Sequence, residues 1–337
     1  MPPTEATEPY KVVRVFFGTD RNVQAGATSP ADRFGSERGH KITYGSCEVS
    51  IPRNHVTGEL ERPFVFKSLL ESPEKHIVLL RIDLRSQDEF HAEVASALAV
   101  APERRALIFV HGFNNSFEEA AHRTAQIAHD VKFTGVPLFY SWPSKASALD
   151  YSFDVNNADQ AVTYLKSFLR DIAQKQSFDS ITLIAHSMGN RALTQAFLEL
   201  KNELGAEKLK VFKELILAAP DIDADFFRNN IAPRLTSIST GITLYASSKD
   251  RALLASKKFN GSPRAGDAGN GLVLYSGIET IDATAVSTDL FWGLGHGYVA
   301  DSRPILDDLN RLVMGNIRAR KRGLAETVTG DGIYWKF

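Results

Sequence analysis

Hydrophobic and polar residues follow two different patterns along this chain, and the change falls near residue 105. Before it, three runs rich in β-branched and aromatic residues, closed by turn-forming residues, predict strands at 11–22, 42–52 and 76–84. Residues 23–40 are rich in Gly, Ser, Asp and Arg without a period, which predicts a surface loop. The first hundred residues therefore predict an antiparallel, β-rich part of a sheet.

From residue 105 onward, short apolar runs alternate with amphipathic segments. The apolar runs predict strands at 105–113, 136–142, 181–187, 214–223, 241–250 and 271–281. The amphipathic segments predict helices at 116–133 and 157–174, from 189 onward, and at 303–317. Ser116, with Glu119 three residues later, predicts a capping box for the first of these helices. Such alternation is typical of an α/β fold, with a mostly parallel sheet covered by helices on both faces.

No low-complexity linker or internal repeat divides the chain, so we expect one α/β domain over residues 1–337. Residues 1–100 would supply the β-rich part of the sheet, and residues 105–316 the core that carries the chemistry. The long segment 141–159 contains two aromatic residues beyond the strand end and is expected to form a partial lid. Residues 317–337, first basic and then polar, predict a solvated tail.

Composition and charge exclude several classes of protein. The chain has 39 Lys and Arg residues against 40 Asp and Glu residues, so no overall field favours nucleic acid. No stretch of about 18 apolar residues occurs, and the N-terminus lacks the pattern of a secretory signal. We therefore expect a cytoplasmic protein without a nucleic-acid partner or a transmembrane segment. Its single cysteine, Cys47, cannot form an internal disulfide and is expected to be a small, half-buried strand residue.

The segment ITLIAHSMGN, residues 181–190, places a serine where a predicted strand turns into a predicted helix. Ala185 and Gly189, two residues to either side of Ser187, are both small. This pattern matches the nucleophile elbow of α/β hydrolases, in which a tight turn lifts the serine hydroxyl clear of the sheet and excludes bulky neighbours. The first small residue is Ala rather than the usual Gly, and N-capping of the helix is the alternative explanation for Ser187.

A catalytic serine in this fold is followed along the chain by an acid and then by a histidine. Of the nine histidines, only His296 follows Ser187, in a Gly-flanked loop after the last predicted strand. Asp250, at the end of the preceding predicted strand, is the favoured acid, which would orient the imidazole. Asp221 and Asp223, one strand earlier, remain alternatives.

Backbone donors for a developing oxyanion are expected at two predicted strand ends. In RALIFVHGFNN, His111 and Gly112 match the His-Gly segment after the third core strand of hydrolases, which assigns the N–H of Phe113. Met188, directly after the serine, would supply the second N–H. Gly112 lets the backbone come close, and His111 is expected to brace the loop rather than to transfer a proton.

Side chains near the same edge of the sheet predict a pocket for an apolar or aromatic group. The expected lining residues are Asn114, Asn115, Tyr140, Trp142, Phe226, Phe227, Phe291 and Trp292. Any single aromatic residue among them could equally belong to the core.

These segments resemble a bacterial family within the α/β-hydrolase superfamily, of largely uncharacterised function and esterase- or lipase-like. The resemblance covers most of residues 11–313. It rests on VFFGTDRN (15–22), FVHGFNNSFEEA (109–120), YSWPS (140–144), IAHSMGN (184–190), APDID (219–223) and YASSKDRAL (245–253). It implies a serine hydrolase with Ser187, Asp250 and His296 as the triad, and no particular substrate.

Together the residues predict acyl transfer through an acyl-enzyme, with no metal or organic cofactor. Hydrolysis of a small-molecule carboxylic ester is the first hypothesis. Amidase, lactonase, thioesterase and acyltransferase activities use the same groups and stay open, as does the oligomeric state. A dehalogenase or an epoxide hydrolase would need a carboxylate at the elbow. A non-catalytic interaction module on the same scaffold is the remaining alternative.

Overall fold

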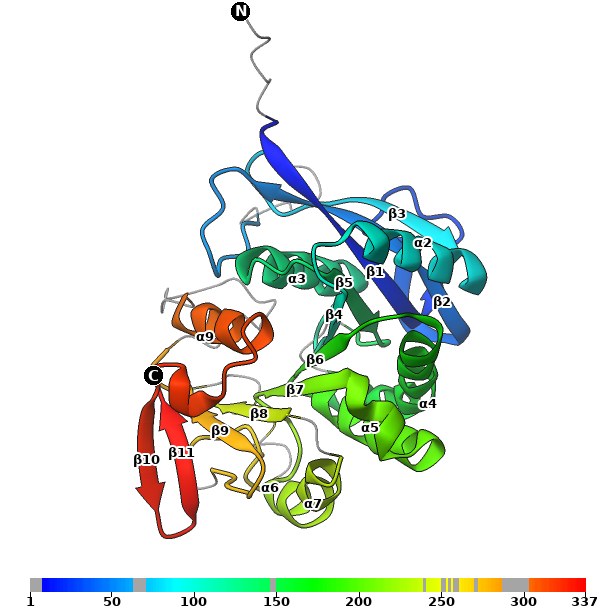
Figure 1. The fold of residues 1–337 in the computed structure, drawn as a ribbon. Helices are drawn as coiled ribbons and strands as arrows, with labels where there is room; N and C mark the ends of the chain where they lie inside the picture. The colour runs from blue at the N-terminus through cyan, green and yellow to red at the C-terminus, as the bar shows by residue number, and fades with distance from the viewer. Residues whose placement is uncertain are drawn as a thin grey trace, which may run out of the picture.

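The computed structural model describes residues 8–62, 71–145, 150–238, 241–249, 253, 256, 261–269, 272–286 and 303–337. Within these residues, helices pack on both faces of one mixed β-sheet (Figure 1). Its strands are β1 (Tyr10–Val23), β2 (Phe34–Pro52), β3 (Leu79–Arg85), β4 (Arg105–Val110), β5 (Val136–Ser141), β6 (Ser180–His186), β7 (Phe212–Ala218), β8 (Gly241–Ala246), β9 (Glu279–Asp282), β10 (Ala325–Thr329) and β11 (Gly332–Lys336).

The helices are α2 (Gln87–Val100), α3 (Phe117–Asp130), α4 (Tyr151–Lys175), α5 (Gly189–Leu204), α6 (Ala224–Phe226), α7 (Ala232–Thr236) and α9 (Arg303–Val313). Two 3-10 turns, η1 (Ala206–Val211) and η4 (Ala319–Lys321), and one π-helical turn, η2 (Phe227–Ile231), complete the described elements.

The strand order across the sheet is β10-β11-β9-β8-β7-β6-β4-β5-β1-β2-β3. All strands from β11 to β1 in this order run parallel, whereas β10, β2 and β3 pair antiparallel at the two ends. The predicted fold class is therefore confirmed, including the antiparallel strands near the N-terminus.

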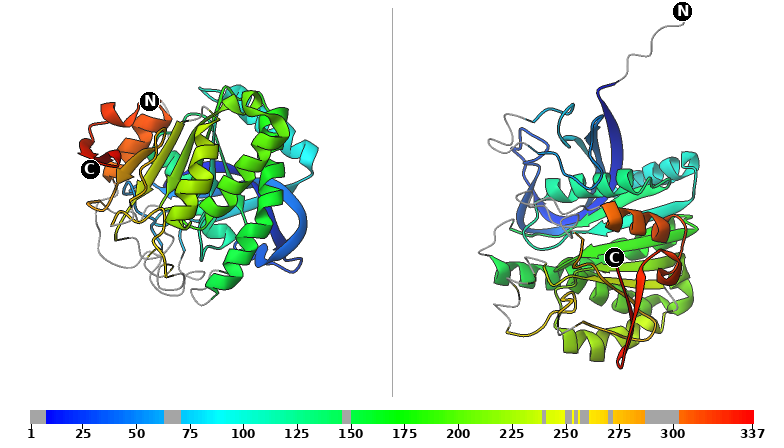
Figure 2. Two further views of the ribbon diagram at one scale, coloured as in Figure 1. Left: turned by 90° about the horizontal axis from the view of Figure 1, so that it is seen from below. Right: turned by 90° about the vertical axis from the view of Figure 1, so that its left-hand side faces the viewer.

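Two apolar layers flank the sheet because successive side chains of a strand point to opposite faces. Ile108 of β4 belongs to the layer under α2, α4 and α5, and Phe109 belongs to the layer under α3 and α9. Figure 2 shows α4 and α5 on one side of the sheet and α9 on the other. A strand covered on both faces reads as a continuous apolar run, which explains the sequence RALIFV of β4.

Two successive connections cross the sheet in opposite directions. From β4 the chain passes through α3 to β5 on one side of β4, and then through α4 to β6 on the other side. The loops after β4 and β6 therefore leave neighbouring strands toward opposite faces. In open α/β sheets, ligands bind at the carboxyl ends of such a pair of strands, so a site is expected at this edge.

Local sequence signals are confirmed where they concern single elements. The Ser116 hydroxyl accepts a hydrogen bond from the Glu119 N–H at 3.1 Å, and the Glu119 carboxylate accepts one from the Ser116 N–H at 2.9 Å. Helix α5 begins at Gly189, as predicted. Helix α4 begins at Tyr151, earlier than the predicted 157.

The first hundred residues differ from the prediction in two places. Residues 34–40, expected in a loop, extend β2 because the end of β1 continues to pair with them, as in Val23 opposite Phe34. Helix α2 lies within the part expected to be β-rich, and it begins with a capping box formed by Ser86 and Glu89. Cys47, expected to be half-buried, is fully buried in β2.

Residues 317–337, expected to be a solvated tail, instead contain η4 and the hairpin β10–β11, which extends the sheet beyond β9. Arg318 pairs with Glu214 of β7 at 2.5 Å, and Arg322 pairs with Asp308 of α9 at 2.8 Å. Arg318 and Arg322 are therefore paired with acidic side chains that lie outside this segment.

The segment 141–159, expected to be a partial lid, forms the end of β5 and the first turns of α4 where it is described. Trp142, Ser144, Asp154 and Asn157 are buried there. Residues 146–149 lie outside the described residues, and the lid stays a prediction.

Candidate active site

Ser187 lies at the corner between β6 and α5. Its backbone φ is 47°, a left-handed conformation that costs a residue with a Cβ about 1–2 kcal/mol. Three hydrogen bonds hold this turn: the Ser187 N–H donates to the Ala218 carbonyl at 2.9 Å, and the Ser187 carbonyl accepts from the N–H groups of Asn190 at 3.1 Å and Asp221 at 3.2 Å. The surrounding structure therefore maintains a strained serine, as a nucleophile elbow requires.

Glycines let the corner and the loop after β4 approach each other. A Cβ on Gly189 would lie 2.3 Å from the His111 carbonyl oxygen, and a Cβ on Gly112 would lie 3.0 Å from the Ser187 Cβ. Both separations are shorter than ordinary van der Waals contacts. The His-Gly loop and the Ser187 corner are thus packed directly against each other.

The side chain of Ser187 is buried, with 1% of its surface exposed, and its hydroxyl has no hydrogen-bond partner in the described part of the chain. The main chain around it is held by Asn190, whose side-chain amide donates to the carbonyls of Ala185, Ser187 and Ala218 at 3.2, 3.1 and 3.1 Å. The Asn190 side chain therefore holds the backbone of the corner, while the Ser187 hydroxyl has no hydrogen-bond partner among the described residues.

The expected oxyanion donors are the N–H groups of Phe113, which follows Gly112 in the loop packed against this corner, and of Met188, which directly follows Ser187. Neither donates a hydrogen bond to any acceptor within the described ranges. The carbonyl of Gly112 accepts from His111 Nδ1 at 2.9 Å and from the Asn115 side-chain amide at 3.4 Å. In a trans peptide the C=O and the N–H point in opposite directions. The contacts of the Gly112 carbonyl therefore fix the direction of the Phe113 N–H.

His111 is locked in one neutral tautomer. The Trp142 N–H donates to His111 Nε2 at 3.1 Å, so Nε2 is an acceptor and the ring proton is on Nδ1. Burial, with the positive charge of Arg21 nearby, lowers the pKa of His111 to about 3. Its ring stacks on Trp142, with centroids 5.0 Å apart. These contacts are those of a residue that braces the loop, the role expected for it.

Arg21, near the end of β1, donates hydrogen bonds to the loop after β4, to the end of β5 and the loop after it, and to the start of β2. Its Nε donates to the Ser141 hydroxyl at 2.8 Å, and its Nη2 donates to the Asn115 carbonyl at 2.7 Å. Its Nη1 donates to the carbonyls of Ser144 at 3.0 Å and Gly35 at 3.2 Å. Burial lowers the pKa of Arg21 to about 10, so the guanidinium is still charged at neutral pH.

Asp154, in the first turn of α4, holds the other side of the loop after β4. Its carboxylate accepts from the Ser144 hydroxyl at 2.5 Å, the Lys145 N–H at 2.9 Å and the Asn114 N–H at 3.4 Å. Burial raises the pKa of Asp154 above its ordinary value. Asn114 has a φ of 59°, so this contact supports a second left-handed residue beside the site.

The two alternative acids already have partners. Asp221 is buried, and its carboxylate pairs with Arg264 Nε at 2.7 Å and accepts from the Tyr151 hydroxyl at 2.9 Å. Asp223 caps α6, where it accepts from the Phe226 N–H at 2.9 Å. This hydrogen bond, the largest contribution, lowers the pKa of Asp223.

Asp250 and His296, the predicted acid and base, lie outside the described residues, as do Phe291 and Trp292. Their assignments stay predictions. The described histidine next to the serine, His186, is buried in the sheet, and this burial, with the charge of Arg123, lowers its pKa to about 3.

The other predicted pocket residues have different surroundings. Tyr140 and Trp142 are fully buried, the first with its hydroxyl donating to Asp20 at 2.8 Å and the second with its indole N–H donating to the His111 carbonyl at 2.7 Å. Phe227 is also buried, whereas Phe226 is 54% exposed. Asn114 and Asn115 lie in the loop after β4. A substrate role for any of them stays a prediction.

Sequence reasoning missed the side chains that support the site from a distance. Arg21, Asp154 and Asn190 belong to this group. Arg21 belongs to VFFGTDRN, one of the segments on which the family resemblance rests, but the sequence assigned no role to this arginine. No sequence signal connects it to residue 115 or residue 144.

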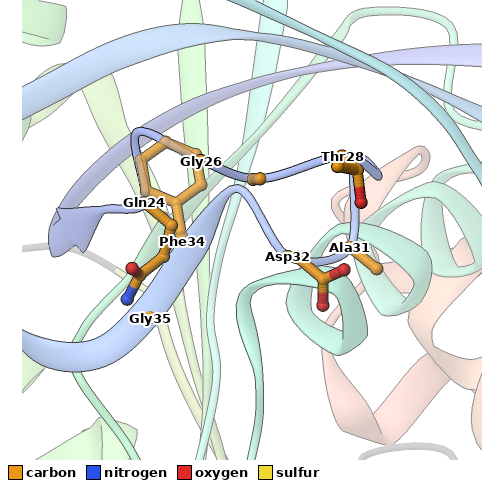
Figure 3. Close-up of a pocket in the computed structure, with 8 residues that line it drawn as sticks. Gln24, Gly26, Thr28, Ala31, Asp32, Phe34 and Gly35 are labelled. Carbon is orange, nitrogen blue, oxygen red and sulfur yellow. The ribbon is translucent and has the colours of Figure 1, made fainter.

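A surface cavity of about 470 Å³ lies in the loop that joins β1 to β2 (Figure 3). It is lined by Gln24, Gly26, Ala27, Thr28, Ala31, Asp32, Phe34 and Gly35. Because β1 runs parallel to β5, β4 and β6, this loop leaves the sheet at the same edge as Ser187.

Neither a metal-ligand cluster nor a membrane-spanning helix occurs among the described residues. Within them, no group of three or more His, Cys, Asp and Glu side chains is arranged to hold a metal ion. No helix in the same part of the chain is long and apolar enough to cross a membrane. The expected cytoplasmic location stays a prediction.

The parallel sheet and the strained serine at its edge define an α/β hydrolase. The chain belongs to the family described as alpha/beta hydrolase of unknown function, DUF900, whose model matches residues 86–314. The superfamily that the motifs predict is thereby confirmed. No curated protein matches the chain.

Among solved structures, the chain is similar to the crystal structure of the "putative cell surface hydrolase" from Lactobacillus plantarum WCFS1. The TM-score is 0.38 and the sequence identity 11%, and the match covers 65% of this chain and 94% of that one.

Proposed function

We propose that the protein is a serine hydrolase that cleaves small-molecule carboxylic esters through an acyl-enzyme. The observation that carries this proposal is the Ser187 corner. Ser187 has a φ of 47° and a hydroxyl without a partner in the described ranges, and the loop that carries Phe113 packs against its corner. The N–H groups of Phe113 and Met188 have no acceptor in those ranges, so they are available as the oxyanion donors that an acyl-transfer site needs.

In the proposed first half-reaction, His296 takes the proton of the Ser187 hydroxyl as Oγ attacks the carbonyl carbon of the ester. The carbonyl oxygen becomes an oxyanion and accepts hydrogen bonds from the N–H groups of Phe113 and Met188. The bond to the alcohol oxygen then breaks, and the alcohol leaves with the proton held by His296. Asp250 would keep the imidazole oriented and stabilise its charged form.

In the second half-reaction, water gives a proton to His296 and attacks the acyl-enzyme. The carboxylic acid leaves, and Ser187 recovers its proton. The chemistry requires no cofactor. Amides, lactones and thioesters could follow the same route, and an acyltransferase would replace water with another acceptor.

The proposed substrate has an apolar or aromatic acyl group. Support comes from Phe226, an exposed aromatic side chain in the segment that follows the strand next to β6. A panel of p-nitrophenyl esters from acetyl to palmitoyl would define the chain length. A short-chain optimum would indicate an esterase, and a long-chain optimum a lipase.

A fluorophosphonate probe tests the function directly. The wild type should be labelled, and Ser187→Ala should not be. Thr194→Ala in α5 serves as a control, because its hydroxyl donates only to carbonyls of its own helix, those of Asn190 at 2.8 Å and Arg191 at 3.5 Å. Labelling of Ser187→Ala, or no labelling of the folded wild type, would contradict the proposal. The second result would indicate a non-catalytic interaction module.

A further inference from the structure

We propose that Arg21 is a positioning residue that sets the geometry of the oxyanion site by holding the loop after β4 against the start of β2 and the end of β5 with the loop after it. This inference rests on the proposed function. Arg21 does not contact the reacting atoms; it acts through Asn115. The segment that contains it, VFFGTDRN, has no other role in the mechanism.

The side chain of Arg21 is buried, and four of the five N–H donors in its rigid guanidinium fork donate to oxygen atoms of Ser141, Asn115, Ser144 and Gly35. The remaining Nη2 donor lies 3.5 Å from His111 Nε2, which already accepts from the Trp142 N–H at 3.1 Å, so this fifth contact is weak. The oxygen acceptors come from β2, from the end of β5 and from the segments that follow β4 and β5.

A continuous chain of contacts connects Arg21 to the oxyanion donor. Arg21 Nη2 donates to the Asn115 carbonyl at 2.7 Å. The side-chain amide of Asn115 donates to the Phe113 carbonyl at 2.7 Å and to the Gly112 carbonyl at 3.4 Å. The Gly112 carbonyl belongs to the same peptide unit as the Phe113 N–H. A shift of Asn115 would therefore rotate the donor itself.

The partners of Arg21 indicate that its shape matters more than its charge. Its hydrogen bonds in the described residues go to carbonyl and hydroxyl oxygens and to one imidazole, and none goes to a carboxylate. The charges of Asp20 and Asp154 act on it without a direct hydrogen bond. A lysine would keep the charge but could not reach acceptors in several directions at once.

The test compares Arg21→Lys with a matched control, Arg14→Lys. Arg14 lies on the same strand, but its side chain is 44% exposed and pairs with Glu93. We expect Arg21→Lys to lower kcat about 10- to 100-fold, because small misplacements of catalytic groups have effects of this size. KM should stay within about threefold, since the donors act mainly on the transition state. Arg14→Lys should resemble the wild type.

A trifluoromethyl ketone separates positioning from a general loss of folded protein. Its adduct with a serine carries an oxyanion, so its Ki for Arg21→Lys should rise in proportion to the fall in kcat/KM. Values are normalised to the sites titrated by the fluorophosphonate. If activity per titrated site and Ki match the wild type, Arg21 only stabilises the fold and the proposal is wrong.

Amide hydrogen exchange keeps the test independent of activity. The N–H groups of Asn114 and Asn115 donate to Asp154 and to the Ser144 hydroxyl at 3.4 and 3.2 Å, and their exchange should accelerate at least about tenfold in Arg21→Lys. Ser141→Ala, which removes one acceptor of Arg21, should give a smaller change in the same direction and covers the case in which Arg21→Lys does not fold. If the exchange rates of the Asn114 and Asn115 N–H groups are unchanged in both Arg21→Lys and Ser141→Ala, the proposal is wrong. A wild type without activity contradicts the proposed function instead, and the exchange rates still decide whether Arg21 holds the loop.

Discussion

The carboxylate of Asp221 pairs with the guanidinium of Arg264 at 2.7 Å, and both side chains are buried. The same carboxylate accepts from the Tyr151 hydroxyl at 2.9 Å and the Ser256 hydroxyl at 2.5 Å. Three donors therefore occupy three of the about four acceptor positions of this carboxylate, and one of them is a charged partner. The Asp221 contacts therefore favour Asp250 as the acid of the proposed triad.

Asp221→Asn should reduce stability, because it leaves the buried Arg264 without its charge partner. The expected loss in the free energy of unfolding is about 3–5 kcal/mol, measured by urea denaturation. Asp250→Asn should instead lower kcat by about a thousandfold or more while the protein stays folded. If Asp221→Asn keeps its stability and Asp250→Asn keeps its activity, the assignment of the acid is wrong.

His55 should make the stability depend on pH. Its Nδ1 lies 2.8 Å from Glu61 and its Nε2 lies 2.8 Å from Asp130. Burial lowers the pKa of His55, but the hydrogen bonds to Asp130 and Glu61 outweigh it and raise the pKa from 6.5 to about 9. The folded state thus binds the proton more tightly than the unfolded state. This contribution is complete below pH 6.5 and is lost as the pH rises through 9.

The measurement is urea denaturation of the wild type and His55→Gln at pH 6 and pH 9.5. The variant should be less stable by about 3 kcal/mol at the lower pH, and the difference should shrink at the higher pH. His129, whose ring centroid lies 5.5 Å from that of His55, supplies the control. Burial lowers the pKa of His129, the opposite direction to His55, so the stability difference caused by His129→Gln should not shrink as the pH rises. A constant difference for His55→Gln would contradict the prediction.

The backbone strain at Ser187 should be measurable as a difference in the free energy of unfolding between two variants. Glycine adopts a φ of 47° without strain, whereas alanine does not, so Ser187→Gly should be more stable than Ser187→Ala. Relief of about 1–2 kcal/mol is partly offset by the greater unfolded-state entropy of glycine, about 0.4–1 kcal/mol. Ser167 in α4 is the control, because glycine in a helix should be about 1 kcal/mol less stable than alanine there. If the alanine variant were more stable than the glycine variant at position 187, as it is expected to be at position 167, backbone strain at Ser187 would be excluded.

Deletion of residues 317–337 should destabilise the protein strongly. The deletion removes Arg318 and Arg322 and leaves Glu214 and Asp308 buried, with side chains 4% and 3% exposed, without their cationic partners. The expected loss is at least about 3–5 kcal/mol by urea denaturation. A shorter deletion of residues 324–337 keeps both arginines and should cost less. Unchanged stability after the longer deletion would support a solvated tail.

The sequence predicts the parts of the fold and site that depend on neighbours in the chain. The capping box of Ser116, the start of α5 at Gly189 and the strand, serine and helix around Ser187 each involve contacts over a few residues. Such contacts leave a pattern that can be read directly. The capping box of Ser86 and Glu89 was an equally local signal for α2, and the β-rich surroundings concealed it.

The remaining features depend on contacts between distant parts of the chain. Arg21 binds Gly35 and Ser144, which are 14 and 123 positions away in the sequence. In the sequence, Arg318 and Arg322 are indistinguishable from solvated charges, because their acidic partners Glu214 and Asp308 lie in other elements of the fold. Residues 34–40 form a strand only because β1 supplies partners for their backbone. No local pattern distinguishes these residues from ordinary surface positions.

Trp142 provides an optical reporter for the loop that carries the proposed oxyanion donor. Its indole is fully buried, stacks on the His111 ring at an interplanar angle of 14° and donates to the His111 carbonyl. Any event that displaces the His-Gly loop must also change the surroundings of this chromophore. Intrinsic fluorescence of a variant that retains only Trp142 among the three tryptophans would therefore follow loop movement in real time, without an added dye.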